Sequence, residues 1–446
     1  MIEKLTSYNP VSDKALGSVK LTKLDNIPTI VSKAQLAAKN WGKLVISERV
    51  RIIKKAYSRV EPYLQELSEL LCKEMGKDIR RGTSEVHGTV FGGTYMADIV
   101  QNALSPHNTG GSTWVEYKPL GVAAIISPWN YPLAMANNLL IPALVAGNTV
   151  VFKPSEETPL IADTFVTLLN EALPKHVLQI VHGDEKQGKA LVESDVNIIG
   201  FTGSMKAGRD IMARSASSLK RLVMELGGND PMIVMADADL MSAARFAVAS
   251  SFENAGQMCT ATERIYVDKE VSDKFESLVT DIAFRYKVGP WDLEGVNIGP
   301  IINKRQHEMI CHHIADAEAK GARIILGSAD QKPPFIQPTV ITDMTPDMLL
   351  EQEETFGPVI AISSFTSIEE AVNRANDSKY GLGAVVFGGP NATTVADKLE
   401  AGMIGVNQGV GGMGDAPWVG AKQSGYGFHG SPEGHRLFAQ TRTVNR

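Results

Sequence analysis

The sequence contains little cysteine, no excess of basic charge and no uninterrupted apolar run of membrane length. Three cysteines in 446 residues exclude a disulfide scaffold, and we expect a reducing, cytoplasmic environment. The formal net charge of −6 and the lack of a basic cluster exclude the charge pattern of nucleic-acid-binding proteins. The longest apolar region, residues 121–152, is interrupted by asparagines and prolines, and Met1–Leu5 lacks the apolar core of an export signal. These absences predict a cytoplasmic protein without a membrane span.

The chain length and the order of apolar segments indicate the fold class. A chain of 446 residues is too long for one compact core, so two or three domains are expected. Strand and helix patterns alternate from residue 122 to 225, which predicts a parallel sheet covered on both faces. The expected strands are Val122–Ile126, Thr149–Lys153, Val177–His182, Ile198–Thr202 and Arg221–Glu225, and the expected helices are Leu133–Leu144, Leu160–Leu173, Gln187–Glu193 and Lys206–Ser217. A second α/β unit is expected over residues 228–422, with strands Pro231–Val234, Val359–Ser363 and Ala384–Val386 and a helix at Leu240–Ser251.

The remaining segments predict a helical scaffold and an arm. Residues 1–30 are expected to be extended or in turns, and residues 32–103 have helical periodicity. Residues 112–119 alternate as one strand of a hairpin does, after a turn at Asn108–Gly111. Residues 437–444 alternate weakly and are expected to add a strand between subunits.

Cys259 is the leading candidate for a reactive side chain. It lies in a glycine-containing turn after the apolar run Ala243–Ser251, and loops between rigid elements often carry chemistry. Cys72 and Cys311 lie in helical patterns and are interpreted as packing residues. Taken alone, Cys259 has the same interpretation, because free cysteine is among the most buried residue types.

Five short motifs change that interpretation. They are Trp129-Asn130, Lys153-Pro154-Ser155-Glu156, Glu225-Leu226-Gly227-Gly228, Gly256-Gln257-Met258-Cys259 and Glu354-Thr355-Phe356-Gly357-Pro358. In this order and spacing they resemble the aldehyde dehydrogenase superfamily across nearly the whole chain, in a short form similar to bacterial semialdehyde enzymes. The resemblance implies an α/β fold with a Rossmann-type NAD-binding domain at 1–108 and 120–227, an α/β catalytic domain at 228–424, and a small β oligomerisation arm at 109–119 and 425–446.

The resemblance implies oxidation of an aldehyde to a carboxylic acid through a cysteine thiohemiacetal and a thioester. Cys259 matches the nucleophile, and the Asn130 amide with the Cys259 backbone N–H matches the oxyanion donors. Glu225 matches the general base that activates water, since a carboxylate in a partly apolar cavity has a raised pKa. We expect Lys153 to be one of the catalytic residues as well as one of the cofactor-binding residues.

A nicotinamide cofactor follows from the same resemblance, with NAD expected and NADP as the alternative. Lys153 and Glu156 match contacts to the adenosine ribose, where a carboxylate repels a 2′-phosphate. On their own, these two residues are also consistent with a solvated surface pair. Glycine-containing strand-to-helix turns at Gly183 and Gly203 are candidates for the pyrophosphate site. The expected cofactor-binding residues are Ser127, Trp129, Lys153, Ser155, Glu156, Gly183, Gly203, Ser204, Leu226, Glu354 and Phe356.

A dinucleotide-binding fingerprint at Gly409–Gly414 is interpreted as a chance match. The residues that follow it, Asp415–Trp418, do not open a helix, and the motif requires one. No metal site is expected either, because Cys311, His312 and His313 are consecutive helical positions that do not converge on one ion.

The substrate pocket is inferred only from positions beside the motifs. These positions are Tyr131, Met135, Asn138, Glu253, Met258, Thr260 and Trp418. One type of succinic semialdehyde dehydrogenase has arginines at positions matching Asn138 and Glu253, and Glu253 would repel a substrate carboxylate. We therefore expect a neutral or amino-bearing aliphatic or aryl aldehyde. The alternative interpretation of Glu253 is an exposed carboxylate at a helix end.

Two other classes of function remain open. One is an aldehyde dehydrogenase that transfers the acyl group to coenzyme A, and Glu225 argues against it because such relatives tend to lack this base. The other is a non-catalytic protein of the same fold, which has no physical reason to retain Asn130, Glu225 and Cys259 together. The expected partners are a small aldehyde and a second copy of the chain, as a homodimer or homotetramer, with neither nucleic acid nor membrane.

Overall fold

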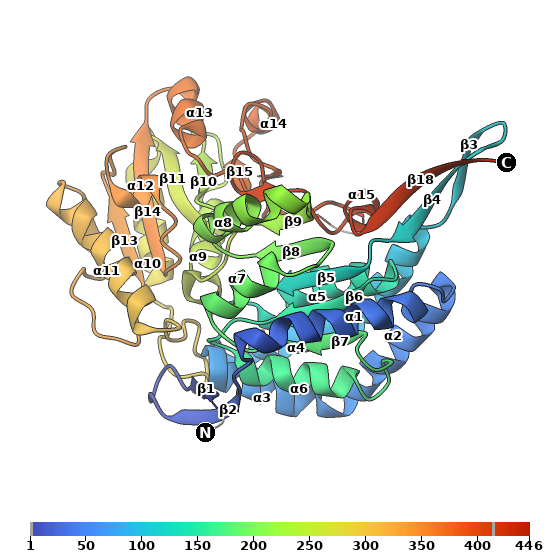
Figure 1. Ribbon diagram of the computed structural model, residues 1–446. Coiled ribbons are helices and arrows are strands. Elements are labelled where there is room, and N and C mark those ends of the chain that lie inside the picture. The colour runs from blue at the N-terminus through green and yellow to red at the C-terminus, as the bar shows by residue number, and fades with distance from the viewer. Residues whose placement is uncertain (1–2, 413–414) are drawn as a thin grey trace.

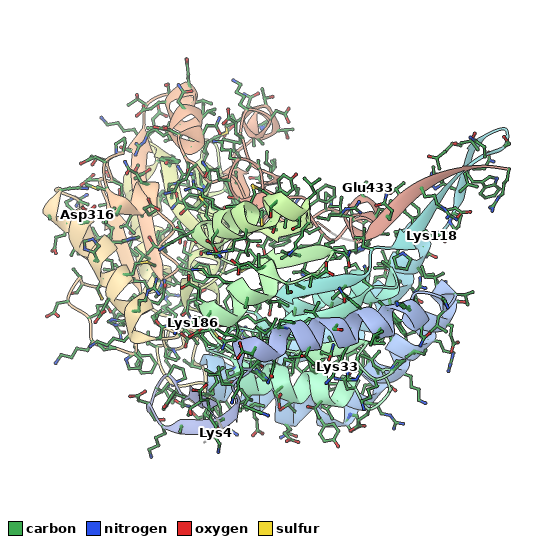
Figure 2. The ribbon with its side chains drawn as sticks, viewed as in Figure 1. Lys4, Lys33, Lys118, Lys186, Asp316 and Glu433 are labelled. Carbon is green, nitrogen blue, oxygen red and sulfur yellow. The ribbon has the colours of Figure 1, made fainter. Side chains whose placement is uncertain are left out.

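The computed structural model describes residues 3–412 and 415–446. Two large sheets form the body of the molecule, and a narrow arm extends from it (Figure 1). No helix of the described residues is long and apolar enough to cross a membrane. Charged side chains such as Lys4, Lys33 and Lys118 project outward from the ribbon and are exposed (Figure 2).

The first large sheet has six strands in the order β17-β9-β8-β5-β6-β7. All neighbouring strands are parallel except the short β17, which pairs antiparallel with β9. Their bounds are β5 Val122–Ile126, β6 Thr149–Lys153, β7 Leu178–Ile180, β8 Ile198–Thr202, β9 Arg221–Glu225 and β17 Gly425–Tyr426. The predicted parallel sheet is therefore confirmed.

Helices cover both faces of this sheet because alternate strand residues point to opposite sides. On β5, Ala123 and Ile125 belong to one apolar core, and Val122 and Ala124 belong to another. The surrounding helices are α1 Ile27–Trp41, α2 Ile46–Val60, α3 Leu64–Met75, α4 Ile79–Ala103, α5 Pro132–Val145, α6 Pro159–Leu169, α7 Glu185–Glu193 and α8 Met205–Ser215. The first core includes residues of α2, α3, α4, α5 and α6, and the second includes residues of α1, α7 and α8.

The second large sheet has seven strands in the order β12-β13-β14-β11-β10-β15-β16, and only β12 is antiparallel to its neighbour. The strands are β10 Asp230–Val234, β11 Thr262–Asp268, β12 Arg323–Leu326, β13 Thr339–Thr342, β14 Val359–Phe365, β15 Gly383–Phe387 and β16 Met403–Val406. Its helices are α9 Leu240–Ser251, α10 Ser272–Ala283, α11 Lys304–Ala319, α12 Leu349–Gln352, α13 Ile368–Asn376 and α14 Ala392–Ala396.

Two small antiparallel sheets complete the fold. The arm consists of β3 His107–Gly110, β4 Thr113–Pro119 and β18 Ala439–Asn445, so the C-terminal tail pairs with β4 of its own chain. A hairpin of β1 Lys4–Tyr8 and β2 Ala15–Lys20 lies near the N-terminus, and α15 Pro432–Arg436 precedes the arm strand β18. The boundaries of the three predicted domains remain a prediction.

Several predicted element boundaries differ from the structure, and three of the differences are explained as follows. Helix α1 begins at Ile27, inside the region expected to be extended, and a proline in its first turn favours this start. Helix α6 ends at Leu169 rather than Leu173, and Pro174 follows closely, where a helix cannot continue. Strand β7 has only three residues because it is the edge strand and pairs with β6 alone.

Candidate active site

The connection between the two large sheets creates the candidate active site. Strand β9 ends at Glu225, and after four intervening residues the chain enters β10 at Asp230. Strand β11 lies beside β10, with Asp230 opposite Thr262, and Cys259 lies three residues before the start of β11. The carboxyl end of one sheet therefore meets the amino end of the other, and Glu225 and Cys259 become neighbours.

The backbone before Cys259 adopts left-handed conformations that are rare for residues other than glycine. Asn254, Ala255 and Gly256 have φ values of 51°, 60° and 72°, three consecutive left-handed residues. A Cβ at Gly256 would lie 2.1 Å from the carbonyl oxygen of Gly357, so only glycine fits there. Such strain persists where surrounding contacts impose it, and here it presents the cysteine loop to the junction of the sheets.

Buried amides tie this loop to Asn130. The Asn130 Nδ2 donates to the Gln257 carbonyl oxygen at 3.1 Å, and Asn254 Nδ2 donates to the Asn130 carbonyl oxygen at 3.2 Å. Gln257 also accepts from the Ile302 N–H at 2.9 Å through its side-chain oxygen. One hydrogen of the Asn130 amide therefore remains for an oxyanion beside Cys259.

A buried ion pair fixes the turn that carries Asn130. Lys77 Nζ lies 2.5 Å from a Glu85 oxygen, donates to the Asn130 carbonyl oxygen at 2.8 Å and sits 3.8 Å from the centre of the Tyr131 ring. Glu85 accepts the Leu133 N–H at 3.0 Å, which caps the start of α5. The pair holds both sides of the turn, so the Asn130 amide is pre-positioned.

The pKa values of the Cys259 thiol and the Glu225 carboxylate are both shifted by their surroundings. Burial, and then the nearby Glu225 charge, raise the pKa of the half-buried Cys259 well above its ordinary value. Burial also raises the pKa of Glu225, while the hydrogen bond from Trp418 opposes that rise. Glu225 is 5% exposed, and its Oε2 has no hydrogen-bond partner among the described residues. The thiol and the carboxylate therefore lie near enough for the charge of Glu225 to raise the pKa of Cys259.

A carboxylate that sequence reasoning missed, Glu263, shapes the loop containing Glu354 and Phe356. Its oxygens accept the backbone N–H groups of Thr355 at 2.9 Å and Phe356 at 2.8 Å, and burial raises its pKa to about 7. Phe356 has a φ of 54° and its ring meets that of Trp129 edge-on, with centroids 5.6 Å apart. Glu354 accepts the Gly228 N–H at 3.0 Å, which joins this loop to the connection between the sheets.

The expected cofactor-binding residues gather at the carboxyl ends of the first sheet. Lys153 ends β6 and is buried, with Nζ 3.2 Å from a Glu156 oxygen, so the pair is only half solvated. Ser155 is buried, and Glu156 is exposed. Ser127, just after β5, is buried and its Oγ has no partner among the described residues.

Two helix N-termini lie at the same ends. Asp184 caps α7 directly after Gly183, where a Cβ would lie 2.3 Å from Gln187. Ser204 caps α8 after Gly203, whose N–H donates to the Glu225 carbonyl oxygen at 3.1 Å. Leu226 packs against α8 at Gly208 and donates its N–H to the Ser424 carbonyl oxygen at 2.9 Å.

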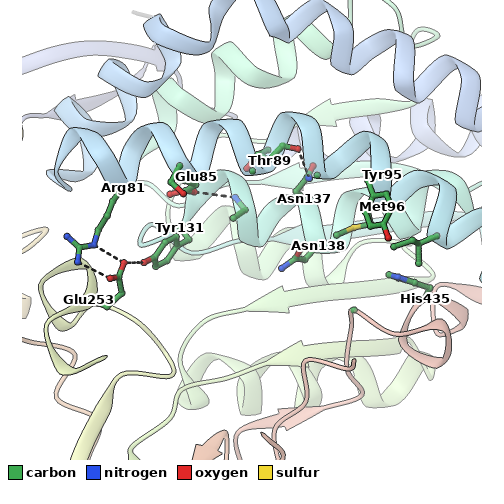
Figure 3. A pocket seen from close by; sticks show the side chains of 16 residues that line it. Arg81, Glu85, Thr89, Tyr95, Met96, Tyr131, Asn137, Asn138, Glu253 and His435 are labelled. Atoms are coloured by element: carbon green, nitrogen blue, oxygen red, sulfur yellow. Dashed lines mark hydrogen bonds and ion pairs between the residues drawn. The ribbon is translucent and has the colours of Figure 1, made fainter. Parts of the chain in front are cut away.

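A cavity of about 480 Å³ lies between α4, α5 and the turn at Glu253 (Figure 3). Of the seven expected pocket residues, Tyr131, Asn138 and Glu253 line it. Met135, Met258, Thr260 and Trp418 do not, and Trp418 instead donates its Nε1–H to Glu225 Oε1 at 3.2 Å. The structure therefore places Tyr131, Asn138 and Glu253 in the cavity, whereas Met258 and Thr260 flank Cys259 in the chain and Trp418 contacts Glu225.

The charge of Glu253 is compensated, contrary to the expectation that it acts as a free repelling carboxylate. Arg81 Nε and Nη2 lie 2.8 and 2.9 Å from the two Glu253 oxygens, and the Tyr131 hydroxyl donates to Oε1 at 2.9 Å (Figure 3). Burial opposes ionisation of Glu253, but Arg81 lowers its pKa. The remaining Arg81 nitrogen, Nη1, donates to Asp78 at 2.6 Å. Glu253 lines the cavity and is not an isolated helix-end carboxylate.

The described residues contain no group of three or more side chains suited to a metal ion. His313 is instead engaged with the Thr355 hydroxyl, 3.0 Å from its Nδ1. Cys72 is buried and packs against Gly82, whereas Cys311 is only half-buried. Through Gly412 the glycine-rich segment after β16 opens no helix, and the last two residues of the chance match at Gly409–Gly414 lie outside the described residues.

A thiol, a carboxylate and an amide therefore lie near the junction of two mainly parallel sheets, as expected for the active site of an α/β enzyme. The profile of the aldehyde dehydrogenase family matches residues 2–444. The chain therefore belongs to the aldehyde dehydrogenase family, and the family and fold predicted from the motifs are confirmed.

Proteins of known name and structure agree with this assignment. The mitochondrial succinate-semialdehyde dehydrogenase of Oryza sativa subsp. japonica is 35% identical over 450 residues, which cover 98% of this chain and 85% of the rice protein. The crystal structure of succinate-semialdehyde dehydrogenase from Burkholderia pseudomallei is 34% identical, with a TM-score of 0.95, and covers 99% of this chain and 94% of its own. An NADP-dependent enzyme of E. coli is 31% identical with the same TM-score, over 99% of this chain and 94% of its own.

Proposed function

We propose that this chain oxidises an aldehyde to a carboxylic acid with a nicotinamide cofactor, through a thioester on Cys259. The observation that carries the proposal is the proximity of the Cys259 thiol to the buried Glu225 carboxylate, with the Asn130 amide held at the same loop. A nucleophile, a base and an oxyanion donor are the groups that acyl chemistry requires. The carboxylate also favours water over coenzyme A as the acyl acceptor.

Three residues carry out the proposed reaction, and Glu225 acts in it twice. Glu225 accepts the Cys259 proton, the thiolate attacks the aldehyde carbon, and the Asn130 amide donates to the resulting oxyanion. When bound, the nicotinamide ring accepts the hydride. Glu225, after releasing its first proton to solvent, accepts a proton from the water that attacks the thioester. The acid is released and the Cys259 thiol is restored.

The residues at the ends of the first sheet fit a nicotinamide cofactor. The buried Ser127 hydroxyl, without a protein partner among the described residues, and the N-termini of α7 and α8 supply donors for a pyrophosphate. Lys153 and Glu156 would hold the adenosine ribose, and Trp129 and Phe356 would flank the nicotinamide side. Lys153 is proposed to act as a cation near the cofactor and not as a proton donor.

The proposal is tested by following NADH formation with neutral, amino-bearing and carboxylated aldehydes in the absence of coenzyme A. We expect turnover with at least one class of aldehyde. Product formation that requires coenzyme A would favour acyl transfer instead. No turnover with any aldehyde, either cofactor or coenzyme A would favour a non-catalytic role.

We expect the enzyme to prefer NAD to NADP. The exposed Glu156 carboxylate would face the 2′-phosphate of NADP and repel it. Glu156→Gln removes the charge with little change of shape and should shift the ratio of kcat/KM for the two cofactors about tenfold toward NADP. The matched control is Glu157→Gln at the adjacent position. A wild-type preference for NADP, the cofactor named for the E. coli structure, would contradict this expectation.

We propose that the substrate is a neutral or amino-bearing aldehyde, although several relatives are named for succinic semialdehyde. Among the described residues that line the cavity, Arg81 is bound by Glu253 and Asp78, and burial lowers the pKa of His435 to about 4. No cation is therefore free in the cavity lining to bind a substrate carboxylate. Tyr131 and Asn138 offer an aromatic face and an amide to an uncharged chain.

Replacing Glu253 should change this selectivity. Glu253→Arg places a second cation beside Arg81, and the kcat/KM ratio of succinic semialdehyde to a neutral aldehyde should rise at least about tenfold. Glu253→Gln, which only releases Arg81, should produce a smaller rise. Glu270→Arg, an equal charge change at an exposed position, should leave the ratio unchanged. An unchanged ratio in the Glu253 variants would mean that substrates do not enter this cavity.

A further inference from the structure

The segment that carries Trp418 is fixed against the strand of the catalytic base. Strand β17 pairs with β9, with Gly425 opposite Glu225. Ser424 accepts the Leu226 N–H at 2.9 Å through its carbonyl oxygen, and its hydroxyl donates to the Gly227 carbonyl oxygen at 2.7 Å. Trp418 lies six residues before Ser424, so its side chain reaches the end of β9 from a rigidly held segment.

The Trp418 ring is itself held in place. Its backbone N–H donates to the His429 carbonyl oxygen at 2.8 Å, and the two rings are stacked with an interplanar angle of 12° and centroids 6.4 Å apart. His429 is buried, and burial lowers its pKa to about 4, so the imidazole is neutral near pH 7. The stack orients the indole without adding a positive charge near Glu225.

We propose that Trp418 is a positioning residue for the general base. Its indole N–H holds Glu225 Oε1 at 3.2 Å, and the buried Oε2 has no protein hydrogen-bond partner among the described residues. One oxygen is thereby anchored and the other is free to accept a proton from water near Cys259. This inference rests on the proposed role of Glu225.

The surroundings of Glu225 make the hydrogen bond from Trp418 important for the charged carboxylate. The groups that face it are Thr202 from β8, the Cys259 thiol, the Glu354 carboxylate and the Trp418 N–H. None of these is a cation, so hydrogen bonds alone stabilise the charged carboxylate. Removing the indole N–H should therefore raise the pKa of Glu225 further and let the carboxylate rotate.

The test is Trp418→Phe, which keeps an aromatic wall and removes the N–H donor. We expect kcat to fall about 10- to 100-fold, because a hydrogen bond to a charged group is lost, while KM changes by less than about twofold. The acidic limb of the kcat–pH profile should move to higher pH. Trp418→His, whose ring can donate a hydrogen bond, should recover part of kcat. Thermal unfolding should first establish that each variant is folded.

A double-mutant cycle separates positioning from substrate contact. In a Glu225→Gln background, Trp418→Phe should cause little further loss of kcat, because both substitutions impair the same function, that of the general base. Additive losses, or a raised KM with an unchanged kcat and pH profile, would overturn the proposal and make Trp418 a substrate-contact residue. If Trp418→Phe does not fold, the same comparison is made with Trp418→Leu, which also lacks the donor, and a wild-type pH profile with additive losses would overturn the proposal.

The proposed function and the positioning role of Trp418 can be disproved separately. If wild-type turnover does not depend on Glu225, then Glu225 is not the base and the role of Trp418 falls with it. If turnover depends on Glu225 but Trp418→Phe leaves kcat and its pH dependence unchanged, only the positioning role is wrong.

Discussion

Cys259→Ser is expected to reduce steady-state NADH formation at least about 10³-fold, the largest effect we foresee. A serine hydroxyl remains protonated beside Glu225, whereas a thiol is far more easily ionised and is a stronger nucleophile. The side chains have similar sizes, so the fold should be retained. The measurement is NADH formation with saturating aldehyde and cofactor, together with thermal unfolding of both proteins.

Cys311→Ser is the matched control because Cys311 lies on α11, outside the group of residues around Cys259. It should retain activity within about twofold, as expected for a substitution remote from the reacting groups. Full activity of Cys259→Ser, or equal losses in the two variants, would contradict the assignment of Cys259 as the nucleophile.

Glu225→Gln is expected to stop the reaction after the thioester forms. Without the carboxylate, water is not activated, and steady-state turnover should fall about 10²- to 10⁴-fold. Rapid-mixing experiments should still detect up to one NADH per subunit, followed by very slow turnover. Mass spectrometry of the mixture should then find the acyl group attached to Cys259.

Glu225 also predicts a pH dependence with a defined sign. Burial raises the pKa of the carboxylate, and its base function requires the ionised form, so kcat should fall as pH decreases through that raised pKa. The acidic limb should disappear in Glu225→Gln, and it should persist in the control Glu171→Gln at an exposed position. An acidic limb unchanged in Glu225→Gln would assign the titration to another group.

The sequence predicted the candidate reacting groups because each lies in a local motif. Asn130 follows Trp129, Glu225 precedes two glycines, and Cys259 ends a short loop between a helix and a strand. The alternation of strands and helices also predicted a parallel sheet with two covered faces. Local sequence patterns predict strands and helices because side-chain periodicity follows directly from backbone geometry.

Contacts between residues distant in sequence were not predictable in the same way. Arg81 neutralises Glu253 across 172 positions, and Trp418 reaches Glu225 across 193. Sequence reasoning placed Trp418 in the substrate pocket because of its position beside a motif, and it missed Lys77, Arg81 and Glu263 entirely. A buried charged residue outside any motif, such as Lys77 in the connection before α4, gives only a weak signal.

The sequence by itself therefore determined the family and the α/β fold, and it supplied the candidates for the nucleophile, the base and the oxyanion donor. Only the tertiary structure decided which charges are free and which are paired, and how the base is held. The physical reason is that residue types determine which side chains can act as a nucleophile or a base, and local spacing determines the order of strands and helices along the chain. The effective charge of a side chain depends instead on burial and on partners that the fold brings from elsewhere in the chain.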